Sequence, residues 1–228
     1  MNFNQTLYKL GFSPIEATVF ITLCEHGSLT GYEVAKLTGI SRSNVYTALY
    51  SLQDKGKCYV SEGESSKYIP ISKEDLLLTT KREMTTTLKE IEQYYPKTVA
   101  VSEPYLTIRG YEHVLNKIKN NILLCESHLY IMSTSENILL LQDELRAISD
   151  RCKIIIMCDK ALNLNDKITV HAHNKPIDAF YMIIDTQIVI TGDLSEQNAQ
   201  CLYSTNYSLV RLMRTSFITA LDMIHLQS

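Results

Sequence analysis

A run of polar side chains between residues 41 and 50 is the part of the sequence best suited to contact another molecule. It holds short hydrogen-bonding groups, one arginine and two amphipathic aromatic residues: Ser41, Arg42, Ser43, Asn44, Tyr46, Thr47 and Tyr50. Groups of these types form hydrogen bonds with phosphates and with the edges of DNA bases. The run therefore predicts a DNA-contacting face. The alternative is the solvated polar face of an ordinary helix.

A single helix must carry these residues. Hydrophobic residues recur on the same segment at i, i+3, i+4 and i+7, namely Val45, Ala48, Leu49 and Leu52. At 100° per residue this stripe faces a core and leaves the polar residues opposite it or on its flanks. Ser41 is suited to cap the start of the helix, and Gly56 stops it after Lys55.

Two capping boxes precede that helix and predict two more. The motif Ser13-Pro14-Ile15-Glu16 opens a helix that ends at Gly27, and Thr30-Gly31-Tyr32-Glu33 opens a short helix that ends at Gly39. Three short helices, of which the last two are joined by a turn of three or four residues, are typical of a helix-turn-helix.

A predicted hairpin follows the third helix. Residues 58–61 and 67–71 are β-prone and are separated by a polar turn that contains Gly63. A helix-turn-helix with such a hairpin is a winged helix, which places its third helix in the major groove and its hairpin along the DNA. The neighbouring cations Lys55, Lys57 and Lys67 are therefore candidate phosphate contacts. For Lys57 the alternative is a solvated strand start.

Three stretches of this region resemble the TrmB-type transcriptional regulators of archaea and bacteria. They are Leu10-Gly11-Phe12-Ser13-Pro14-Ile15-Glu16-Ala17, then Glu33-Val34-Ala35 through Gly39-Ile40-Ser41-Arg42-Ser43-Asn44-Val45-Tyr46, then Leu49 through Leu52 to Lys55-Gly56. The resemblance implies binding of a double-stranded DNA operator as a homodimer, and transcription altered by a small effector. This sequence departs from the family at Lys57, where an apolar residue is usual.

Residues 73–96 are predicted to form a linker helix that Pro96 ends. An apolar stripe of Leu77, Met84, Leu88, Ile91 and Tyr95 runs along it, with coiled-coil spacing over the last four. The stripe predicts dimerisation, although Lys81 interrupts it; the alternative is packing on its own chain.

Residues 97–228 alternate strands with helices. Strands are expected at 105–108, 129–132, 153–158, 168–172, 179–184 and 188–191, and helices at 111–125, 136–149 and 206–226. This order predicts an α/β layer with a largely parallel sheet. The chain as a whole is thus predicted to be an α/β two-domain protein, with a winged helix-turn-helix over residues 1–72 and a linker helix between the domains.

The second domain resembles a single phospholipase D-type repeat, whose enzymes carry the motif HxKxxxxD. The resemblance aligns Asp185 with the family aspartate, which puts Asp178 at the nucleophilic histidine and Phe180 at the phosphate-binding lysine. His173 and Lys175 form an HxK pair out of register. Without the nucleophile and the lysine we expect no phosphodiester cleavage, so no catalytic residue is predicted.

A cleft at the strand ends of this domain could still bind an effector. The candidates are Ser133, Thr134, Ser135, Asp159, His171, His173, Asp178 and Asp185. The alternative for each is a polar residue that caps a strand end. Because longer sugar-responsive regulators continue beyond the point where this sequence ends, the resemblance does not imply a sugar.

Composition narrows the class of protein. The 228 residues have a net charge of -3 and 45% hydrophobic residues, which excludes disordered and polycationic proteins. No apolar run approaches the roughly 20 residues that span a bilayer, and the start lacks an export signal, so a cytoplasmic protein is expected. Six cysteines without a CxxC pair predict buried thiols rather than a metal site, and no cofactor is expected.

The sequence therefore favours a dimeric, non-enzymatic transcriptional regulator. Residues 1–72 carry six Lys and Arg against six Asp and Glu, so we expect positioned contacts rather than bulk charge to determine DNA binding. Two alternatives stay open: a phospholipase D-type phosphodiesterase or nuclease tethered to DNA, and a DNA-binding scaffold without an effector.

Overall fold

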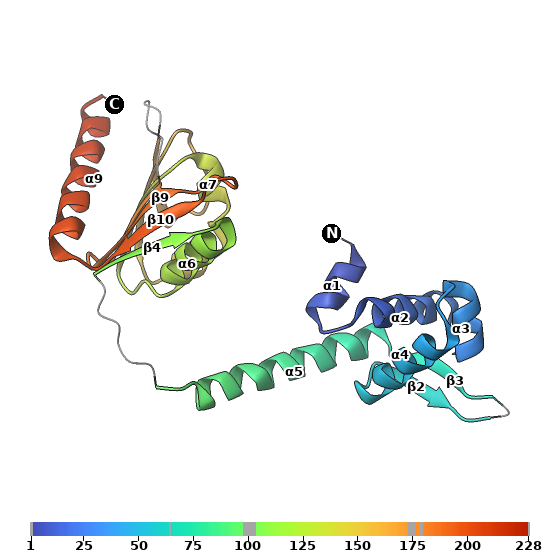
Figure 1. Cartoon of the computed structure of the whole chain (residues 1–228). Coiled ribbons are helices and arrows are strands. Elements are labelled where there is room, and N and C mark those ends of the chain that lie inside the picture. Colours follow the sequence, from blue (N-terminus) through green and yellow to red (C-terminus); the bar gives the residue numbers. More distant parts are fainter. Residues whose placement is uncertain (1, 64, 98–103, 173–176, 178–179, 228) are drawn as a thin grey trace. The chain divides into compact units, whose positions relative to one another are not determined.

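The computed structural model describes residues 2–63, 65–97, 104–172, 177 and 180–227. Its chain divides into two compact units, Met1–Val99 and Ala100–Ser228. Figure 1 shows the helices of the first unit and the large sheet of the second. No helix among these residues is long and apolar enough to cross a membrane.

The first unit is built from five helices and three short strands among its described residues. They are α1 (Phe3–Lys9), α2 (Pro14–His26), β1 (Leu29–Thr30), α3 (Gly31–Thr38), α4 (Arg42–Asp54), β2 (Cys58–Ser61), β3 (Lys67–Pro70) and α5 (Lys73–Tyr94). The helices expected from the capping boxes are confirmed as α2 and α3, and both boxes form. The hairpin is confirmed as β2 and β3, which pair antiparallel.

Two elements of this unit had no clear sequence signal. Helix α1 packs Leu7 into the core, and β1 adds two residues to the free side of β3, so the sheet order is β1-β3-β2. The predicted stripe of α4 is buried in the same core, with Leu7, Phe20, Leu23 and Val34 around it. The polar face of α4 is consequently turned away from the core.

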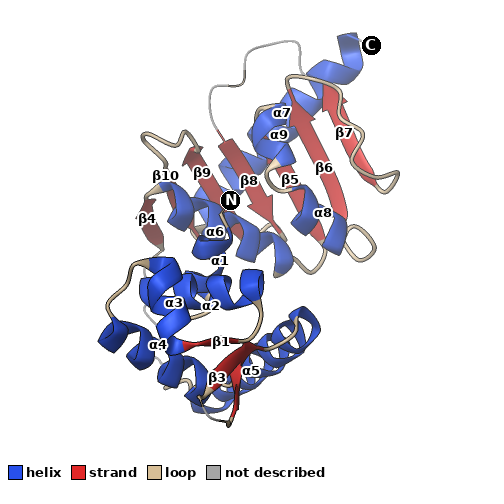
Figure 2. Ribbon diagram, turned by 90° about the vertical axis from the view of Figure 1, so that its right-hand side faces the viewer, coloured by secondary structure: helices blue, strands red, loops and turns tan. Residues whose placement is uncertain are grey.

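The second unit is a seven-stranded sheet with helices on both faces. Its elements are β4 (Tyr105–Arg109), α6 (Tyr111–Leu123), β5 (His128–Met132), α7 (Ser135–Leu139), α8 (Gln142–Ile148), β6 (Lys153–Cys158), β7 (Ile168–Ala172), β8 (Phe180–Ile184), β9 (Ile188–Asp193), β10 (Gln200–Ser204) and α9 (Tyr207–Gln227). The strand order is β4-β10-β9-β8-β5-β6-β7 (Figure 2).

Alternation along the strands supplies two hydrophobic cores. On β5, Leu129 and Ile131 face the core formed with α6, α7 and α8, whereas Tyr130 and Met132 face the core formed with α9. One helix, α9, covers one face of the wide sheet, whereas α6, α7 and α8 cover the other. The core under α9 consequently holds fewer buried residues than the core under the other three helices. The α9 side of the sheet therefore holds half-exposed apolar residues.

The expectation of a largely parallel sheet is wrong. Only β5–β6 and β6–β7 are parallel, and the other four neighbouring pairs are antiparallel. Residues 185–187 join β8 to β9, and a connection that short allows only an antiparallel pair. Strand β10 was not predicted. At its contact with β9, a Cβ on Gly192 would lie 2.1 Å from the Gln200 carbonyl oxygen, so a glycine is needed there.

The expected helix over residues 136–149 is in fact two helices, α7 and α8. The chain bends between them, and the bend puts Leu141 fully inside the core. The strands expected from apolar runs and the closing helix α9 are observed at or within a few residues of the expected positions.

Candidate functional site

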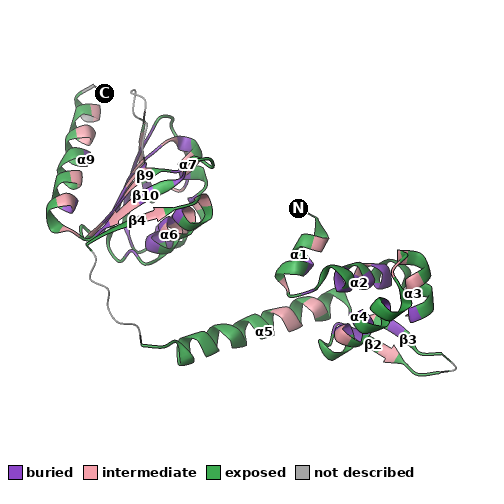
Figure 3. Cartoon of the chain, viewed as in Figure 1, coloured by how far each residue is buried: buried purple, intermediate pink, exposed green. Residues whose placement is uncertain are grey.

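Helix α4 presents the predicted polar face to solvent. All seven residues of that face, from Ser41 to Tyr50, are exposed, while the opposite stripe is 0–4% exposed (Figure 3). Ser41 caps the helix by accepting a hydrogen bond from the Asn44 amide at 3.4 Å. The structure thus brings these residues together on one accessible surface.

Helix α3 adds a residue to this surface that the sequence analysis missed. The ring of Tyr32 is half exposed, and the guanidinium carbon of Arg42 lies 4.4 Å from its centroid. A cation–π contact of this kind orients a long, otherwise free side chain. Arg42 is therefore held at the start of α4, where a phosphate or a base edge would meet it. Tyr32 lies inside the second capping box, and a tyrosine at this position does not by itself indicate contact with Arg42.

Two tyrosines fix the flank of the same surface. The ring centroids of Tyr46 and Tyr50 lie 6.3 Å apart. The Tyr46 ring also lies against Gly31, where an added Cβ would approach it to 2.6 Å. Gly31 therefore lets α3 and α4 come close enough for Tyr46 to lie flat between them.

A carboxylate buried between α2 and α4 sets the position of α4. Glu16 accepts hydrogen bonds from the Ser13 amide at 2.7 Å, the Ser51 hydroxyl at 2.6 Å and the Lys55 ammonium at 2.7 and 2.9 Å. Burial by itself raises the pKa of Glu16, but the hydrogen bonds from Lys55, Ser51 and Ser13 outweigh it and hold the pKa below its ordinary value.

The same contacts change the expectation for Lys55. Its ammonium is bound to Glu16 and to the Gly11 carbonyl oxygen at 3.1 Å, and its side chain is 40% exposed. Its charge is thus neutralised inside the unit, because α4 ends directly beside the first turn of α2. Lys55 joins the two helices, and its ammonium already has a carboxylate partner.

Lys57 does not lie on the exposed polar surface of α4, and its burial fits neither a phosphate contact nor a solvated strand start. Its side chain is only 6% exposed, and its ammonium contacts both carboxylate oxygens of Glu83 on α5 at 3.2 Å. The aliphatic stem is buried just before β2, while the ammonium reaches Glu83 on α5. Lys67, at the start of β3, is exposed as expected.

The apolar stripe of α5 is exposed along its whole length. The side chains of Leu77, Met84, Leu88, Ile91 and Tyr95 are 51–68% exposed, and α5 has no buried residue (Figure 3). At the first half of α5 the stripe borders a groove of about 430 Å³ that α1 helps to form through Phe3 and Leu10. Within the described residues of its unit, this stripe is not covered.

The predicted effector residues of the second unit fall into separate places. Ser133, Thr134 and Ser135 follow β5, and the Ser135 amide donates to Asp159, which follows β6. This bond holds the pKa of Asp159 below its ordinary value. His171 lies on the neighbouring strand β7, opposite Met157. His173 and Asp178 lie outside the described residues.

A small polar cavity lies at this end of the sheet. Its volume is about 220 Å³, and its lining includes Ser133, Thr134, Asn137, Phe180, Asp193 and Ser195. Hydrogen bonds already engage part of this lining, since Asn137 donates to the Ser133 hydroxyl at 3.0 Å and Thr134 caps α7. Phe180, at the position that the phospholipase D alignment assigns to lysine, is 1% exposed.

Asp185 does not belong to this group. It follows β8, which runs antiparallel to β5, so it lies beside the start of β5 whereas Ser133 lies after its end. Its carboxylate accepts hydrogen bonds from the amides of Glu126, Ser127 and His128 at 2.8–2.9 Å and from the Ser127 hydroxyl at 2.8 Å. The antiparallel strand thus turns an expected ligand residue into an anchor for the loop before β5.

Burial by itself raises the pKa of Asp185, but the amides of Glu126, His128 and Ser127 and the Ser127 hydroxyl lower it far below its ordinary value. Both Asp185 and Thr186 have positive φ, at 49° and 56°. Among the residues that the structure describes, no three His, Cys, Asp or Glu side chains are grouped so that they could hold a metal ion.

The chain is similar to a known protein family, to two curated relatives and to a solved structure. Residues 7–74 match the family described as the sugar-specific transcriptional regulator TrmB. The chain is 29% identical over 133 residues to the uncharacterized protein YrhO of Bacillus subtilis (strain 168), a match that covers 57% of this chain and 48% of YrhO.

A second relative is the HTH-type sugar sensing transcriptional regulator TrmBL1 of Pyrococcus furiosus, 25% identical over 132 residues that cover 53% of this chain and 39% of TrmBL1. The chain spans about half the length, or less, of these two curated relatives. The solved structure of TrmBL2, described as an archaeal chromatin protein with a novel mode of DNA binding, matches with a TM-score of 0.46 and 20% identity over 92% of this chain and 93% of that one.

Proposed function

We propose that the chain is a sequence-specific DNA-binding transcriptional regulator, because residues 7–74 match the TrmB family and the chain is similar to a curated regulator of that kind. The observation that carries this proposal is the accessible polar face of α4, opposite a stripe that is fully buried. A helix held in this way, with short polar side chains and one oriented arginine, suits the major groove.

In the proposed complex α4 enters the major groove and the β2–β3 hairpin lies along the DNA as a wing. The contacting side chains are those of the α4 face together with Tyr32 and Lys67. Lys55 and Lys57 are left out because Glu16 and Glu83 bind their ammonium groups. Because positive and negative side chains balance over residues 1–72, we expect base-edge contacts to contribute more to the affinity than phosphate charge does.

We expect Arg42→Ala to weaken binding to the selected operator about tenfold. Removing one guanidinium that contacts a guanine or a phosphate costs on the order of 1–3 kcal/mol. The operator is first obtained by binding-site selection with the purified chain. Affinity is then measured by fluorescence anisotropy at roughly physiological salt.

Lys57→Met is the matched control for the loss of one positive charge. The Lys57 side chain is buried and bound to Glu83, so the variant's affinity for the operator is expected to stay within about twofold of that of the unaltered chain. Equal affinity of Arg42→Ala and the unaltered chain would show that α4 does not read the DNA through this face.

The apolar stripe of α5 supports a homodimer. Leu77, Met84, Leu88 and Ile91 are exposed on one side of a helix of 22 residues, and the last three have coiled-coil spacing. Tyr95 is also exposed but forms the C-cap, just beyond the last residue of the helix. Pairing two copies of α5 would bury these side chains and set the separation of two DNA-reading helices, as paired half-sites require.

Leu88→Lys is expected to raise the dimer dissociation constant at least about tenfold, because a charge replaces a leucine that pairing buries. Sedimentation equilibrium of the full chain measures the constant. Thr86→Lys adds the same charge on the opposite side of α5 and should leave it unchanged. Dimers that are equally stable in both variants would place the interface elsewhere.

For the second unit we propose a non-enzymatic role in effector sensing or assembly. Phe180 is buried where a phosphate-binding lysine would stand, and the Asp185 carboxylate is occupied by the loop before β5. The polar cavity near Ser133 and Thr134 is the proposed strand-end effector site. Robust phosphodiesterase turnover on DNA or lipid by the purified chain would contradict the non-enzymatic proposal.

A further inference from the structure

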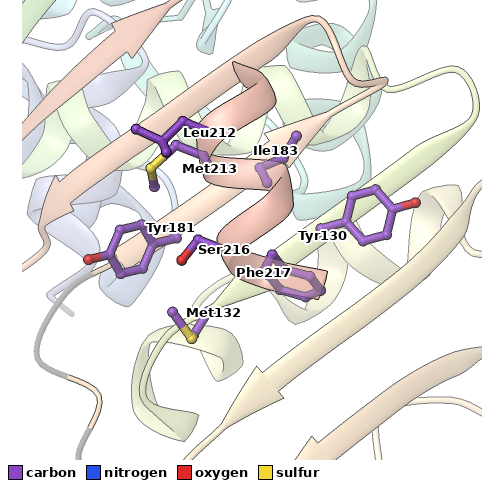
Figure 4. A pocket seen from close by; sticks show the side chains of 8 residues that line it. All are labelled: Tyr130, Met132, Tyr181, Ile183, Leu212, Met213, Ser216 and Phe217. Atoms are coloured by element: carbon purple, nitrogen blue, oxygen red, sulfur yellow. The ribbon is translucent and has the colours of Figure 1, made fainter. Parts of the chain in front are cut away.

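The second unit has a larger, apolar cavity that is separate from the polar one at the strand ends. It lies between α9 and the sheet, has a volume of about 330 Å³, and is lined by residues of β5, β8 and α9 (Figure 4). Its volume is at the lower end of the roughly 300–1,000 Å³ that ligand pockets occupy. None of the strand-end candidates that the structure describes lines it.

The floor of this cavity follows from the register of two strands. Tyr130 pairs with Ile183, and Met132 pairs with Tyr181, so these four side chains are cross-strand neighbours on the α9 face. Tyr130, Met132 and Tyr181 are only partly buried, although each lies in the middle or at the end of a strand inside the sheet. The sheet thus offers an apolar floor that the protein itself does not close.

Helix α9 forms the wall. Val210 and Phe217 anchor it against Met157, Ile183 and Val189, and the Phe217 ring lies 5.4 Å from the Tyr130 ring. Met213 is partly buried beside the floor, but Leu212 is 65% exposed. The helix thus packs on the sheet through Val210, Phe217 and their neighbours, and leaves space along the side that carries Leu212, Met213 and Ser216.

The lining defines the chemistry of an occupant. It consists of aromatic and aliphatic side chains, two methionine thioethers and a serine, and no described residue that lines it is charged. A charged ligand would lose hydration without gaining a counter-charge. Aromatic rings favour stacked or edge-to-face contacts, and methionines adapt to an irregular shape. In Figure 4 the Ser216 hydroxyl lies between Tyr181 and Phe217, where it can bond one polar group.

We infer that this cavity between α9 and strands β5 and β8 binds a small, uncharged aromatic or largely apolar molecule that carries a hydroxyl or carbonyl group. The Tyr130, Phe217 and Tyr181 rings contact its apolar body, and Ser216 forms the hydrogen bond. A partner helix is disfavoured because it is about 10–12 Å wide and cannot enter a cavity of this size. The inference goes beyond DNA binding and does not depend on it.

The test uses the full chain and 2-naphthol as the probe, with 2-naphthoate and glucose as comparisons, in isothermal titration calorimetry. 2-Naphthol is expected to bind at least about tenfold more tightly than 2-naphthoate and to raise the melting temperature of the chain. Glucose is expected not to bind at this cavity. Ser216→Trp fills the cavity from an exposed position on α9 and should weaken 2-naphthol binding at least about tenfold.

Ser208→Trp is the matched control, because Ser208 is exposed on the same helix but does not line the cavity. The affinity of Ser208→Trp for 2-naphthol should equal that of the unaltered chain. Circular dichroism should show that Ser208→Trp and Ser216→Trp are both folded. A second variant, Leu212→Asp, places a carboxylate at the exposed rim and should also weaken binding.

Three outcomes would overturn the inference. The first is absence of 2-naphthol binding up to its solubility limit. The second is equal affinity in Ser216→Trp and the unaltered chain, which would place the probe elsewhere. The third is self-association of the chain that Ser216→Trp abolishes while no probe binds, which would mean that a second copy covers the cavity. Loss of operator binding in Arg42→Ala has no bearing on any of these results.

Discussion

Replacing Asp185 by alanine is expected to lower the free energy of unfolding of the second unit by about 4 kcal/mol. The change leaves three backbone amides and the Ser127 hydroxyl without their acceptor, and hydrogen bonds to a charged group contribute on the order of 1.5–3 kcal/mol each, with less than additive effect at a partly exposed site. Alanine also fits poorly at a φ of 49°, which costs roughly 1 kcal/mol more.

Asp185→Asn separates the loss of hydrogen bonds from the cost of alanine at a positive φ. Asparagine tolerates the left-handed conformation and keeps one carbonyl oxygen, but its amide group would face an N–H donor. We expect Asp185→Asn to lower the free energy of unfolding by about half as much as Asp185→Ala does. Asp166→Asn is the control for charge, since Asp166 is exposed on a loop. Native-state hydrogen exchange of the full chain, read at the amides of residues 126–128 and in the sheet, measures the stability of the second unit separately from that of the first.

The same carboxylate predicts the acid stability of this unit. Its pKa in the folded protein lies below the ordinary value of about 3.9 for an unfolded aspartate. The lowered pKa therefore contributes stability that is fully present above about pH 4 and is lost as the pH falls below it. The Asp185→Asn variant should lose less stability over this acid range than the unaltered chain. Identical acid transitions of the two proteins would show that Asp185 does not anchor the loop.

Replacing Glu16 by alanine is expected to destabilise the first unit by about 3 kcal/mol. Glu16 is 5% exposed and joins the start of α2 to Ser51 and Lys55 at the end of α4. Its removal opens a capping box and leaves the Lys55 ammonium without its carboxylate. Since the Glu16 contacts fix α4 against α2, we also expect weaker operator binding by the folded fraction.

Glu16→Gln keeps the shape of the side chain and should show about half of this loss. Glu25→Gln, at an exposed position on the same helix, is the matched control and should change stability by less than about 0.5 kcal/mol. Urea unfolding of the full chain, followed by hydrogen exchange in α2 and α4, gives the values. A Glu16→Ala variant as stable as the control would mean that packing alone positions α4.

Local signals in the sequence determined the elements of the first unit. The two capping boxes form as expected, with their glycines just past the helix ends, and the stripe of Val45, Ala48, Leu49 and Leu52 is buried. These features depend on contacts between residues that are close in sequence, so spacing and residue type suffice to predict them. Runs of apolar residues likewise predicted most strands of the second unit, and helical spacing predicted the apolar stripe of α5, whose exposure only the structure shows.

Side-chain partners far apart in sequence were decided only by the tertiary structure. Lys55 and Lys57 were equivalent cations by type, yet each meets a carboxylate on another helix, Glu16 or Glu83. Asp185 is another case, because its role depends on whether β8 runs parallel or antiparallel to β5. Hydrophobic periodicity predicts that a strand exists but carries no information about its direction.

By itself, then, the sequence determined most of the helices and strands, but not α1, β1, β10 or the division between α7 and α8. It also determined which face of α4 is buried and which polar residues lie opposite it. The tertiary structure decided which charges remain free on that face, that Tyr32 holds Arg42, that Asp185 and Ser133 lie at opposite ends of the sheet, and that α9 leaves a cavity above β5 and β8. The physical reason is that periodicity reports the burial of one element, whereas charge pairing, strand direction and incomplete packing depend on contacts between elements.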